Sequence, residues 1–385
     1  MKLRMGMVGG GEGSFIGTVH RMAAELDGTI QLVAGAFSSD EKRSIRSGTE
    51  MYGLVPNRCY NNYKEMLLRE SQLPADQRID FVTVVTPNHL HHPVAVLALE
   101  SGFHVVCDKP ATFTLPEALD LKVRIDQAER IFALTHNYTG YPMIREARHL
   151  VQIGALGKLR RINVEYIQGW LADRLEVLGN KQAEWRTDPS RSGTAGCIGD
   201  IGTHAFQLAE FTTNQKVEWL SSDLSTFVPA RRLDDDGNIL LRFEGGPKGV
   251  LCASQIAVGV ENNLSIRLYG ELGGVEWSQL EPNSLVVRWN DRPFEVRRTG
   301  GPGVHEPAVE ATRLPAGHPE GFLEAFAVLY KNFARAVRQC ASGTAIGNCE
   351  QDFPTIEDGI RGMAFIEAAV ASSQQNSKWT KLTTE

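Results

Sequence analysis

The sequence predicts an α/β protein in which a domain with a parallel sheet, residues 1–136, precedes a domain with antiparallel strands, residues 137–385. A chain of 385 residues is too long for one typical hydrophobic core, so two domains are expected. The first third alternates short β-rich runs with helical stretches, which is typical of a parallel sheet with helices on both faces. Beyond residue 137 the β-rich runs are longer and adjacent, which indicates antiparallel pairing.

The elements expected in the first domain follow from this alternation. The predicted strands are 3–8, 30–37, 80–86, 103–107 and 131–135. The predicted helices are 16–26, 40–52, 62–70, 89–101 and 116–129.

Composition argues against two classes of partner. The net charge is −6 with no block of Lys or Arg, which argues against nucleic-acid binding. No apolar run approaches the roughly 18 residues needed to cross a bilayer, and the amino end lacks the apolar core of a secretory signal. The six cysteines are scattered without a CxxC pair, as in reduced proteins. We therefore expect a cytoplasmic protein without a membrane partner.

A glycine-rich turn follows the first predicted strand. It reads Gly9-Gly10-Gly11-Glu12-Gly13-Ser14-Phe15-Ile16-Gly17 and leads into a helix, as in loops that bind a pyrophosphate. The strict G-x-G-x-x-G spacing fails because residue 14 is serine. Gly9, Gly11 and Gly17 fill the three glycine roles if about three extra residues widen the loop, with Gly13 as the alternative to Gly11. The expected cofactor contacts are Gly9, Gly11, Gly13, Ser14, Phe15 and Ile16.

The end of the second predicted strand bears on the choice between NAD and NADP. It reads Phe37-Ser38-Ser39-Asp40-Glu41-Lys42-Arg43. Asp40 and Glu41 would repel the 2′-phosphate of NADP, whereas Ser38 and Ser39 could donate hydrogen bonds to it. We therefore favour NAD and leave NADP open, with Ser38 and Ser39 as ribose-side contacts.

A polar loop leaves the third predicted strand. It reads Thr86-Pro87-Asn88-His89-Leu90-His91-His92 and lies at the carboxyl edge of the sheet, where ligands of such sheets bind. Three histidines in four residues suggest a metal site, but no acid is spaced for helical pairing with them, so we expect no metal. Thr86, Pro87, Asn88 and His91 are instead expected to contact the cofactor.

Lys109 follows the fourth predicted strand, in Cys107-Asp108-Lys109-Pro110. Pro110 biases Lys109 away from helical dihedrals, so its ammonium should project from the carboxyl end of the strand. There it could stabilise an oxygen that becomes alkoxide-like when a carbinol loses hydride. The alternative is a solvated surface lysine.

The second domain should contain longer, adjacent strands separated by turns. The predicted strands are 159–168, 216–227, 238–244, 248–257, 262–269, 274–278 and 284–289. The predicted turns are Asp236-Gly237, Gly245-Gly246-Pro247 and Gly273-Gly274. Asp234-Asp235-Asp236-Gly237 lacks the later ligands of a calcium loop, so a polar hairpin turn is expected there.

A helix with paired polar groups is predicted between the first two of these strands. Ile201, Ala205 and Leu208 recur at helical spacing and form its buried stripe. Asp200 and His204 are four residues apart and share one face. An imidazole exchanges protons near neutral pH and a carboxylate can orient it. The alternative is a capping aspartate beside an unrelated, partly buried histidine.

Together these motifs resemble the glucose-fructose oxidoreductase/inositol dehydrogenase/rhizopine-catabolism (Gfo/Idh/MocA) family over essentially the whole chain. The resemblance rests on the glycine turn, on Thr86-Pro87-Asn88 through His91, on Asp108-Lys109-Pro110, and on Asp200 with His204 in Gly-Asp-Ile-Gly-Thr-His. The family's lysine-proline motif usually begins with glutamate, whereas this chain has Asp108. The widened glycine loop is a second departure.

The resemblance implies an N-terminal Rossmann domain and a C-terminal α+β domain with a large, mostly antiparallel open sheet. It implies a nicotinamide cofactor, an active site between the domains, and catalytic roles for Lys109, Asp200 and His204. Asp108, Lys109 and Asn137 would also contact the cofactor. The open sheet would form a homodimer or homotetramer interface, and the last helix, near 355–375, would pack back on the first domain.

Further residues suit a polyhydroxylated substrate, since guanidinium and imidazole groups bind hydroxyls and aromatic faces cover sugar C–H groups. Trp185 and Arg186 have structural alternatives, as a core residue and an ion pair. The expected substrate contacts are Lys109, Tyr138, Trp185, Arg186, Asp200, His204 and His318.

The predicted function is therefore NAD(P)-dependent, reversible oxidation of a secondary hydroxyl of a sugar, sugar derivative or inositol to a ketone. His204 would be the general acid/base, Lys109 would stabilise the alkoxide and Asp200 would orient His204. One alternative is a glycoside-cleaving enzyme in which bound NAD oxidises the sugar transiently. The other is a nicotinamide-binding sensor, which would need none of these three side chains.

Overall fold

The computed structural model describes residues 2–384 and forms two compact units. The first unit comprises Met1–Thr135 and Phe326–Ile360, and the second comprises His136–Ala325 and Arg361–Glu385. Two late helices, Phe322–Ala341 and Ile356–Gln374, are each divided between the two units. Most of the first of these helices and the first turn of the second belong to the first unit.

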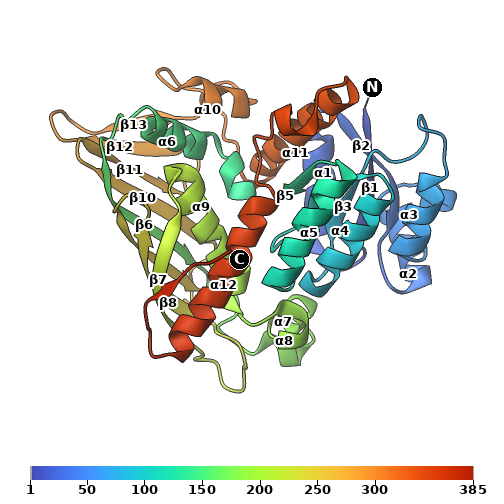
Figure 1. Cartoon of the computed structure of the whole chain (residues 1–385), viewed down its shortest axis with the longest axis horizontal. Coiled ribbons are helices and arrows are strands. Elements are labelled where there is room, and N and C mark those ends of the chain that lie inside the picture. Colours follow the sequence, from blue (N-terminus) through green and yellow to red (C-terminus); the bar gives the residue numbers. More distant parts are fainter. Residues whose placement is uncertain (1, 385) are drawn as a thin grey trace. The chain divides into compact units, whose positions relative to one another are not determined.

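The first unit is built on a five-stranded parallel sheet of order β2-β1-β3-β4-β5, which confirms the predicted sheet (Figure 1). All five residues of the central strand β3 are buried, as expected for a strand covered on both faces. The strands are β1 (Leu3–Gly9), β2 (Ile30–Ala36), β3 (Phe81–Val85), β4 (His104–Cys107) and β5 (Phe132–Leu134).

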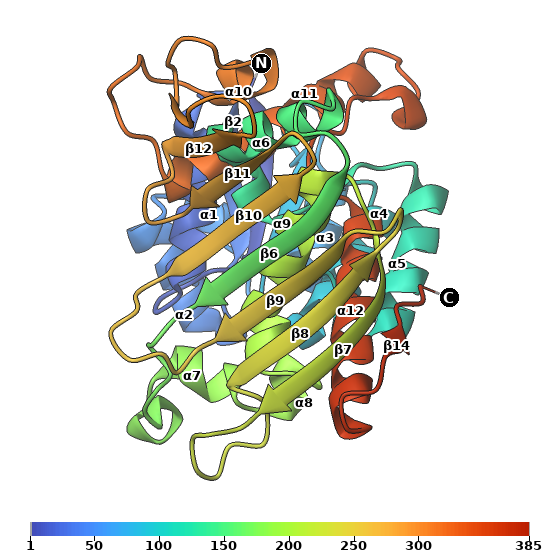
Figure 2. The ribbon, with the colours of Figure 1, turned by 90° about the vertical axis from the view of Figure 1, so that its left-hand side faces the viewer.

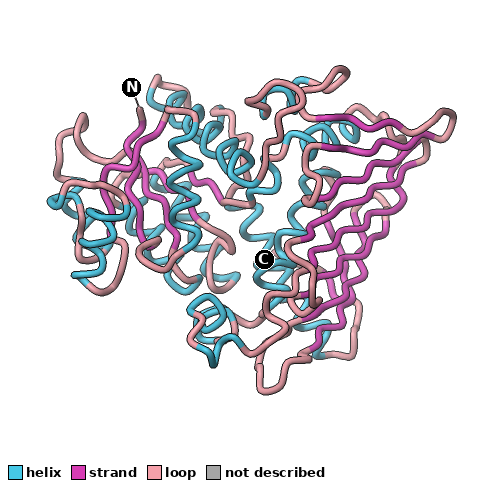
Figure 3. Tube along the Cα trace, turned by 180° about the vertical axis from the view of Figure 1, so that it is seen from behind, coloured by secondary structure: helices cyan, strands magenta, loops and turns pink. Residues whose placement is uncertain are grey.

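Helices cover both faces of this sheet, as right-handed crossovers require. The helix after β1 packs beside the late helix α11 on one face, while α3, α4 and α5 lie on the other (Figures 1 and 3). Side-chain caps at Ser14, Asn62 and Thr114 begin three of these helices. The helices are α1 (Phe15–Leu26), α2 (Glu41–Arg46), α3 (Tyr63–Ser71), α4 (His91–Glu100), α5 (Leu115–Ala128) and α11 (Phe322–Ala341), the last belonging to this unit from Phe326.

The glycine loop packs closely against its surroundings. A Cβ on Gly17 would lie 2.4 Å from Cα of Gly10, so glycine lets α1 approach the loop. A Cβ on Gly11 would lie 2.5 Å from the carbonyl oxygen of Phe37, whose backbone also accepts a hydrogen bond from Gly11. Gly9 and Gly13 have φ of 86° and 83°, which favours glycine. The widened loop is therefore compact.

The second unit is built on a nine-stranded sheet of order β13-β12-β11-β10-β6-β9-β8-β7-β14, and its mostly antiparallel pairing was predicted. Only the β6–β9 pair is parallel among the described strands of this sheet. The strands are β6 (Leu159–Ile167), β7 (Val217–Ser225), β8 (Asp236–Phe243), β9 (Lys248–Ser254), β10 (Asn263–Gly270), β11 (Gly273–Ser278), β12 (Ser284–Trp289), β13 (Glu295–Arg298) and β14 (Thr380–Lys381). The two edge strands β13 and β14 were not predicted, because one is highly charged and the other has two residues.

The helices of the second unit leave one face of its sheet uncovered. In Figure 2 this face is turned to the viewer, with α6 and α9 behind the strands. Buried side chains of β6, β8, β9 and β10 alternate with more exposed ones, which is the pattern of a sheet covered on one side. The helices are α6 (Pro142–Gln152), α7 (Lys181–Arg186), α8 (Pro189–Ser192), α9 (Thr203–Thr213), α10 (Glu306–Ala311) and α12 (Ile356–Gln374), the last belonging to this unit from Arg361.

Two of the predicted turns were wrong. Asp236-Gly237 begins β8 and Gly273-Gly274 begins β11, whereas Gly245-Gly246-Pro247 does lie in a turn. The glycines serve close packing instead: a Cβ on Gly237 would lie 2.8 Å from side-chain atoms of Ile198 and Leu224. The expected polar hairpin turn at Asp234–Gly237 is therefore the end of a longer loop and the start of a strand.

All six cysteines carry free thiols, although Sγ of Cys340 lies 2.7 Å from Sγ of Cys349. Among residues 2–384, no helix combines the length and the apolar composition that a membrane crossing requires.

Substitution of Gly11 by valine is expected to weaken binding of the nicotinamide cofactor by distorting the loop. The branched side chain would collide with the Phe37 carbonyl and with Ser47 Oγ, at a cost of about 1–3 kcal/mol. Titration calorimetry measures the affinity, and Gly347→Val is the control because a Cβ there meets no atom within 4 Å. Unchanged affinity in a folded Gly11→Val protein would contradict this account of the loop.

Candidate active site

Lys109 lies two residues beyond β4 at the carboxyl end of the parallel sheet, as the sequence predicts. The amide of Asp108 donates to the carbonyl of Val84 at 2.9 Å, which continues the pairing of β4 with β3 by one residue. Oδ1 of Asp108 accepts hydrogen bonds from Thr135 Oγ1 and from the amide of Lys109, both at 2.9 Å. The shorter acid in this motif thus fixes the backbone that carries Lys109.

A buried polar chain lies behind Asp108. Nδ1 of His20 is 2.7 Å from Oη of Tyr330, and Tyr330 Oη is 3.2 Å from Oγ1 of Thr83. Burial lowers the pKa of His20 to about 4, so the ring is neutral at neutral pH. If the Thr83 hydroxyl donates its hydrogen to Tyr330, and the Tyr330 hydroxyl donates to Nδ1 of His20, the neutral ring carries its proton on Nε2. This Nε2 atom lies 4.0 Å from Oδ2 of Asp108. Sequence reasoning missed His20, because its partners lie far away in the chain.

His91 joins the two loops at this edge of the sheet. Its Nδ1 lies 2.6 Å from the carbonyl oxygen of Pro110, and its Nε2 lies 2.8 Å from that of Thr86. The ring is buried, and burial lowers its pKa. The predicted cofactor residue His91 therefore supports both loops from within. Of the other two histidines in this loop, His89 is exposed and His92 pairs with Asp120 at 2.8 Å.

The first unit fits a dinucleotide at this edge. Its glycine loop admits no side chain at Gly11, and Ser14 caps the helix whose amino end faces that loop. The buried hydroxyl of Thr86 has no hydrogen-bond partner within the described protein, as expected for a group that meets a ligand. Phe15 is 68% exposed at the start of α1, and Ser38 and Ser39 follow β2.

Nearby, Asp40 is engaged by the protein itself, since its side chain accepts from the amide of Arg43 at 2.8 Å and begins α2. Its carboxylate therefore lies at a fixed place just past Ser38 and Ser39.

Asp200 and His204 lie in consecutive helical turns of the second unit. A π-helical turn, Ile198–Gly202, carries Asp200 and runs directly into α9, which carries His204. Oδ2 of Asp200 accepts from Nε of Arg186 at 3.0 Å and from Nε2 of Gln255 at 2.9 Å. Two donors therefore hold this carboxylate in place. Gln255 was not predicted because it follows a distant strand.

His204 lies in a mostly buried cluster of rings. Its Nδ1 is 3.4 Å from Nδ1 of His136, and its ring packs edge-on against Tyr138 at a centroid distance of 4.9 Å. The hydroxyls of Tyr138 and Tyr166 share a short hydrogen bond. Contact between the two Nδ1 atoms requires one ring to donate and the other to accept. His136 lies two residues beyond β5, and the sequence did not predict its contact with His204.

The remaining predicted residues have different surroundings: some are paired within the protein, one is buried and one is exposed. Arg186 stacks over Trp185 at 4.2 Å from its ring centroid and forms the ion pair with Asp200, which was the structural alternative for this residue. Asn137 is buried, and its Nδ2 atom lacks a hydrogen-bond partner within the described protein, as for a ligand-facing amide. His318 is exposed, with Nδ1 3.1 Å from the carbonyl of Pro315.

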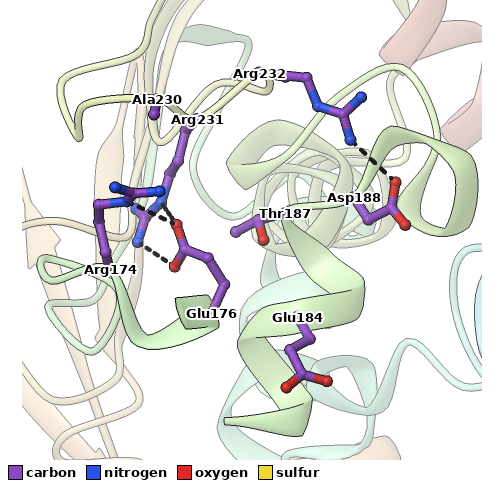
Figure 4. A pocket seen from close by; sticks show the side chains of 8 residues that line it. All are labelled: Arg174, Glu176, Glu184, Thr187, Asp188, Ala230, Arg231 and Arg232. Carbon is purple, nitrogen blue, oxygen red and sulfur yellow. Dashed lines mark hydrogen bonds and ion pairs between the residues drawn. The ribbon is translucent and has the colours of Figure 1, made fainter. Parts of the chain in front are cut away.

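A polar cavity of about 250 Å³ lies beside this part of the second unit (Figure 4). Arg231 pairs there with Glu176 at 3.2 Å, and Arg232 pairs with Asp188 at 3.3 Å. Because its acids and arginines neutralise each other, the cavity does not form an anion site. It is lined by Arg174, Glu176, Glu184, Thr187, Asp188, Ala230, Arg231 and Arg232.

Comparison with known proteins agrees with this geometry. Residues 3–136 match an oxidoreductase family with an NAD-binding Rossmann fold, and residues 144–276 match the GFO/IDH/MocA C-terminal domain. The chain is 32% identical to an uncharacterised oxidoreductase, YfiI, of Bacillus subtilis, over 98% of this chain and 96% of that protein. It is 25% identical to levoglucosan dehydrogenase of Pseudarthrobacter phenanthrenivorans, over 79% of this chain and 80% of the enzyme.

Solved structures agree as well. An inositol dehydrogenase homologue from Azotobacter vinelandii, complexed with NADH and myo-inositol, is 33% identical with a TM-score of 0.91, over 99% of this chain and 98% of that one. Both units thus have counterparts in one oxidoreductase, in the same order. The chain belongs to the Gfo/Idh/MocA family of NAD-binding oxidoreductases.

Proposed function

We propose that this oxidoreductase oxidises a secondary hydroxyl of a sugar, sugar derivative or inositol to a ketone, reversibly. The observation that carries the proposal is Asp200, which two donors hold as a carboxylate one helical turn before the ring cluster of His204. The bound nicotinamide supplies the hydride acceptor. What the chain must supply is a proton acceptor, a fixed positive charge and substrate orientation.

Each of these tasks has a candidate group. The imidazole of His204 accepts the hydroxyl proton during oxidation and returns it during reduction. Its contact with Nδ1 of His136 gives that proton a second acceptor. Asp200 favours the protonated ring that forms. The ammonium of Lys109 stabilises the negative charge that develops on the substrate oxygen.

The substrate class rests on the side chains around His204 and on the relatives. Tyr138 packs edge-on against His204, and Asn137, its neighbour in the chain, has a buried Nδ2 that lacks a hydrogen-bond partner within the described protein. One relative is a levoglucosan dehydrogenase, and one similar structure holds myo-inositol, both of which carry several ring hydroxyls. We therefore propose a cyclic polyol or sugar. The free thiols fit the cytoplasmic location that the sequence predicts.

The cofactor preference is proposed to be NAD. Asp40 is held beside Ser38 and Ser39, where its charge opposes a 2′-phosphate. The direct test follows nicotinamide absorbance with myo-inositol, levoglucosan and a panel of free sugars against both cofactors. Turnover of at least one polyol with NAD is expected. A kcat/KM for NADP more than about tenfold higher would overturn the preference, and absence of turnover with every compound would overturn the proposed activity.

We also propose that the uncovered sheet face joins two or four copies of the chain. This face carries Trp219, Leu240 and Tyr269, which are 38%, 51% and 39% exposed, among paired charges such as Glu165 with Arg267. Leu240→Glu is expected to shift the protein to a smaller species in size-exclusion chromatography with light scattering, because it buries a charge in an apolar contact. Leu178→Glu, which changes a 75% exposed leucine away from the sheet, should not. A monomeric parent would refute the proposed interface.

Lys109→Met is expected to abolish most turnover while leaving cofactor affinity near the parent value. Loss of one group that stabilises an oxyanion costs up to about 4 kcal/mol, or roughly a thousandfold in kcat. Steady-state rates and cofactor titration measure the two effects, and Lys122→Met, at an exposed ion pair with Glu357, is the control. Retention of more than about half of the parent kcat would remove Lys109 from the mechanism.

His204→Ala is expected to lower kcat about 10²–10⁴-fold, with a smaller rise in KM, and to flatten the neutral limb of the pH–rate profile. Asp200→Asn should cost less, since it changes the orientation and charge of the imidazole but leaves the proton acceptor. His92→Ala provides the control at a histidine paired with Asp120. An unchanged rate and pH dependence in His204→Ala would make His204 structural.

A further inference from the structure

Two adjacent aspartates before β8 bind different loops of the second unit in the same way. Asp234 accepts from the amide of Gly196 with Oδ1 at 2.7 Å and from that of Ile198 with Oδ2 at 2.8 Å. Asp235 accepts from Phe227 and Val228 in the same manner, at 2.8 and 3.0 Å. Each carboxylate thus holds two nearby amides, but only Asp234 holds the segment that leads to Asp200.

The backbone of residue 234 strengthens this clamp. Its carbonyl accepts from the amide of Cys197 at 2.8 Å, so residue 234 binds three consecutive amides, 196 to 198. The carbonyl of Gly196 in turn accepts from the amide of Asp200 at 2.9 Å. A Cβ on Gly196 would lie 2.3 Å from the carbonyl oxygen of Asp234, so the contact requires glycine. The clamp therefore reaches the backbone of Asp200 through a single residue.

Different contacts position the side chain of Asp200 and the backbone that carries it. Arg186 and Gln255 hold its side chain, but neither fixes the start of the π-helical turn. Ile198 opens that turn and also packs against Gly237, three residues beyond Asp234. Charge-assisted hydrogen bonds to amides are among the stronger ones in proteins, and two from one carboxylate restrict position as well as distance. Misplacement of a reacting group by about 1 Å can cost roughly a hundredfold in rate.

We propose that Asp234 is a positioning residue, which sets the place of Asp200 and His204 by holding the amides of Gly196 and Ile198. The inference rests on the proposed function, since it assigns Asp234 a part in the same reaction. Both of its carboxylate oxygens are engaged by these backbone amides. Asp235 makes equivalent bonds to the amides of residues 227 and 228 and serves as the control, and its carboxylate also pairs with Arg231 at 3.6 Å.

The test compares Asp234→Asn with Asp235→Asn in the full-length protein. Each change replaces one acceptor oxygen by an NH2 group that opposes an amide N–H, so both variants should lose stability in thermal unfolding, and Asp235→Asn also weakens the ion pair with Arg231. Asp234→Asn is expected to lower kcat about tenfold to a hundredfold, with KM for NAD within about twofold of the parent. Asp235→Asn should keep the parent kcat. Myo-inositol and levoglucosan are the substrate probes.

Hydrogen exchange supplies a readout that does not depend on turnover. Asp234→Asn should speed exchange at the amides of residues 196–200, and Asp235→Asn should do so at 227 and 228. Asp234→Glu keeps the charge and both oxygens, so its kcat should lie between those of the parent and Asp234→Asn. This second variant carries the comparison if Asp234→Asn does not fold.

The outcomes separate the inference from the proposed function. Parent-like kcat in a folded Asp234→Asn, or equal losses of kcat in both asparagine variants, would overturn the positioning role. Unchanged exchange at 196–200 would overturn the clamp itself. If the parent protein turns over neither probe nor any other polyol, the proposed function fails, while the exchange comparison still decides whether Asp234 holds this segment.

Discussion

The rest of the site depends on one constraint: the mostly buried carboxylate of Asp200 needs polar partners within the protein. An unpaired carboxylate in such a place would take up a proton or unfold its surroundings. The guanidinium of Arg186 and the amide of Gln255 meet this need, and each comes from a different part of the unit. The position of Asp200 therefore depends on two segments that are distant from it in the chain.

The first unit meets a related constraint at the end of β4. Asp108 accepts from Thr135 and from the amide of Lys109, and faces the neutral ring of His20. An aspartate at this place holds the lysine backbone by direct hydrogen bonds, with a buried histidine behind it. In both units a short acidic side chain thus accepts hydrogen bonds in or beside the segment that carries a residue proposed to be catalytic.

The sequence was sufficient for the parallel sheet, most strands and the motif residues, because period, glycine placement and strand-end chemistry are local signals. It could not identify His20 or Gln255, or the contact of His136 with His204, because these depend on partners many residues away. The turns expected at Gly237 and Gly274 were wrong for the same reason. Glycine is found both in turns and at positions where a neighbouring side chain packs against the backbone. The sequence does not distinguish these two uses, whereas the packing in the structure does.

The central claim, hydride transfer from a carbinol carbon with net reduction of the cofactor, is tested most directly by isotope transfer. The full-length protein is incubated with NAD and with myo-inositol or levoglucosan deuterated at the ring carbons, and the reduced cofactor is analysed by mass spectrometry. The account predicts reduced cofactor that carries one deuterium, formed more slowly than from unlabelled substrate. Unlabelled reduced cofactor, or a changed substrate without net reduction of NAD, would contradict it and favour a transient oxidation instead.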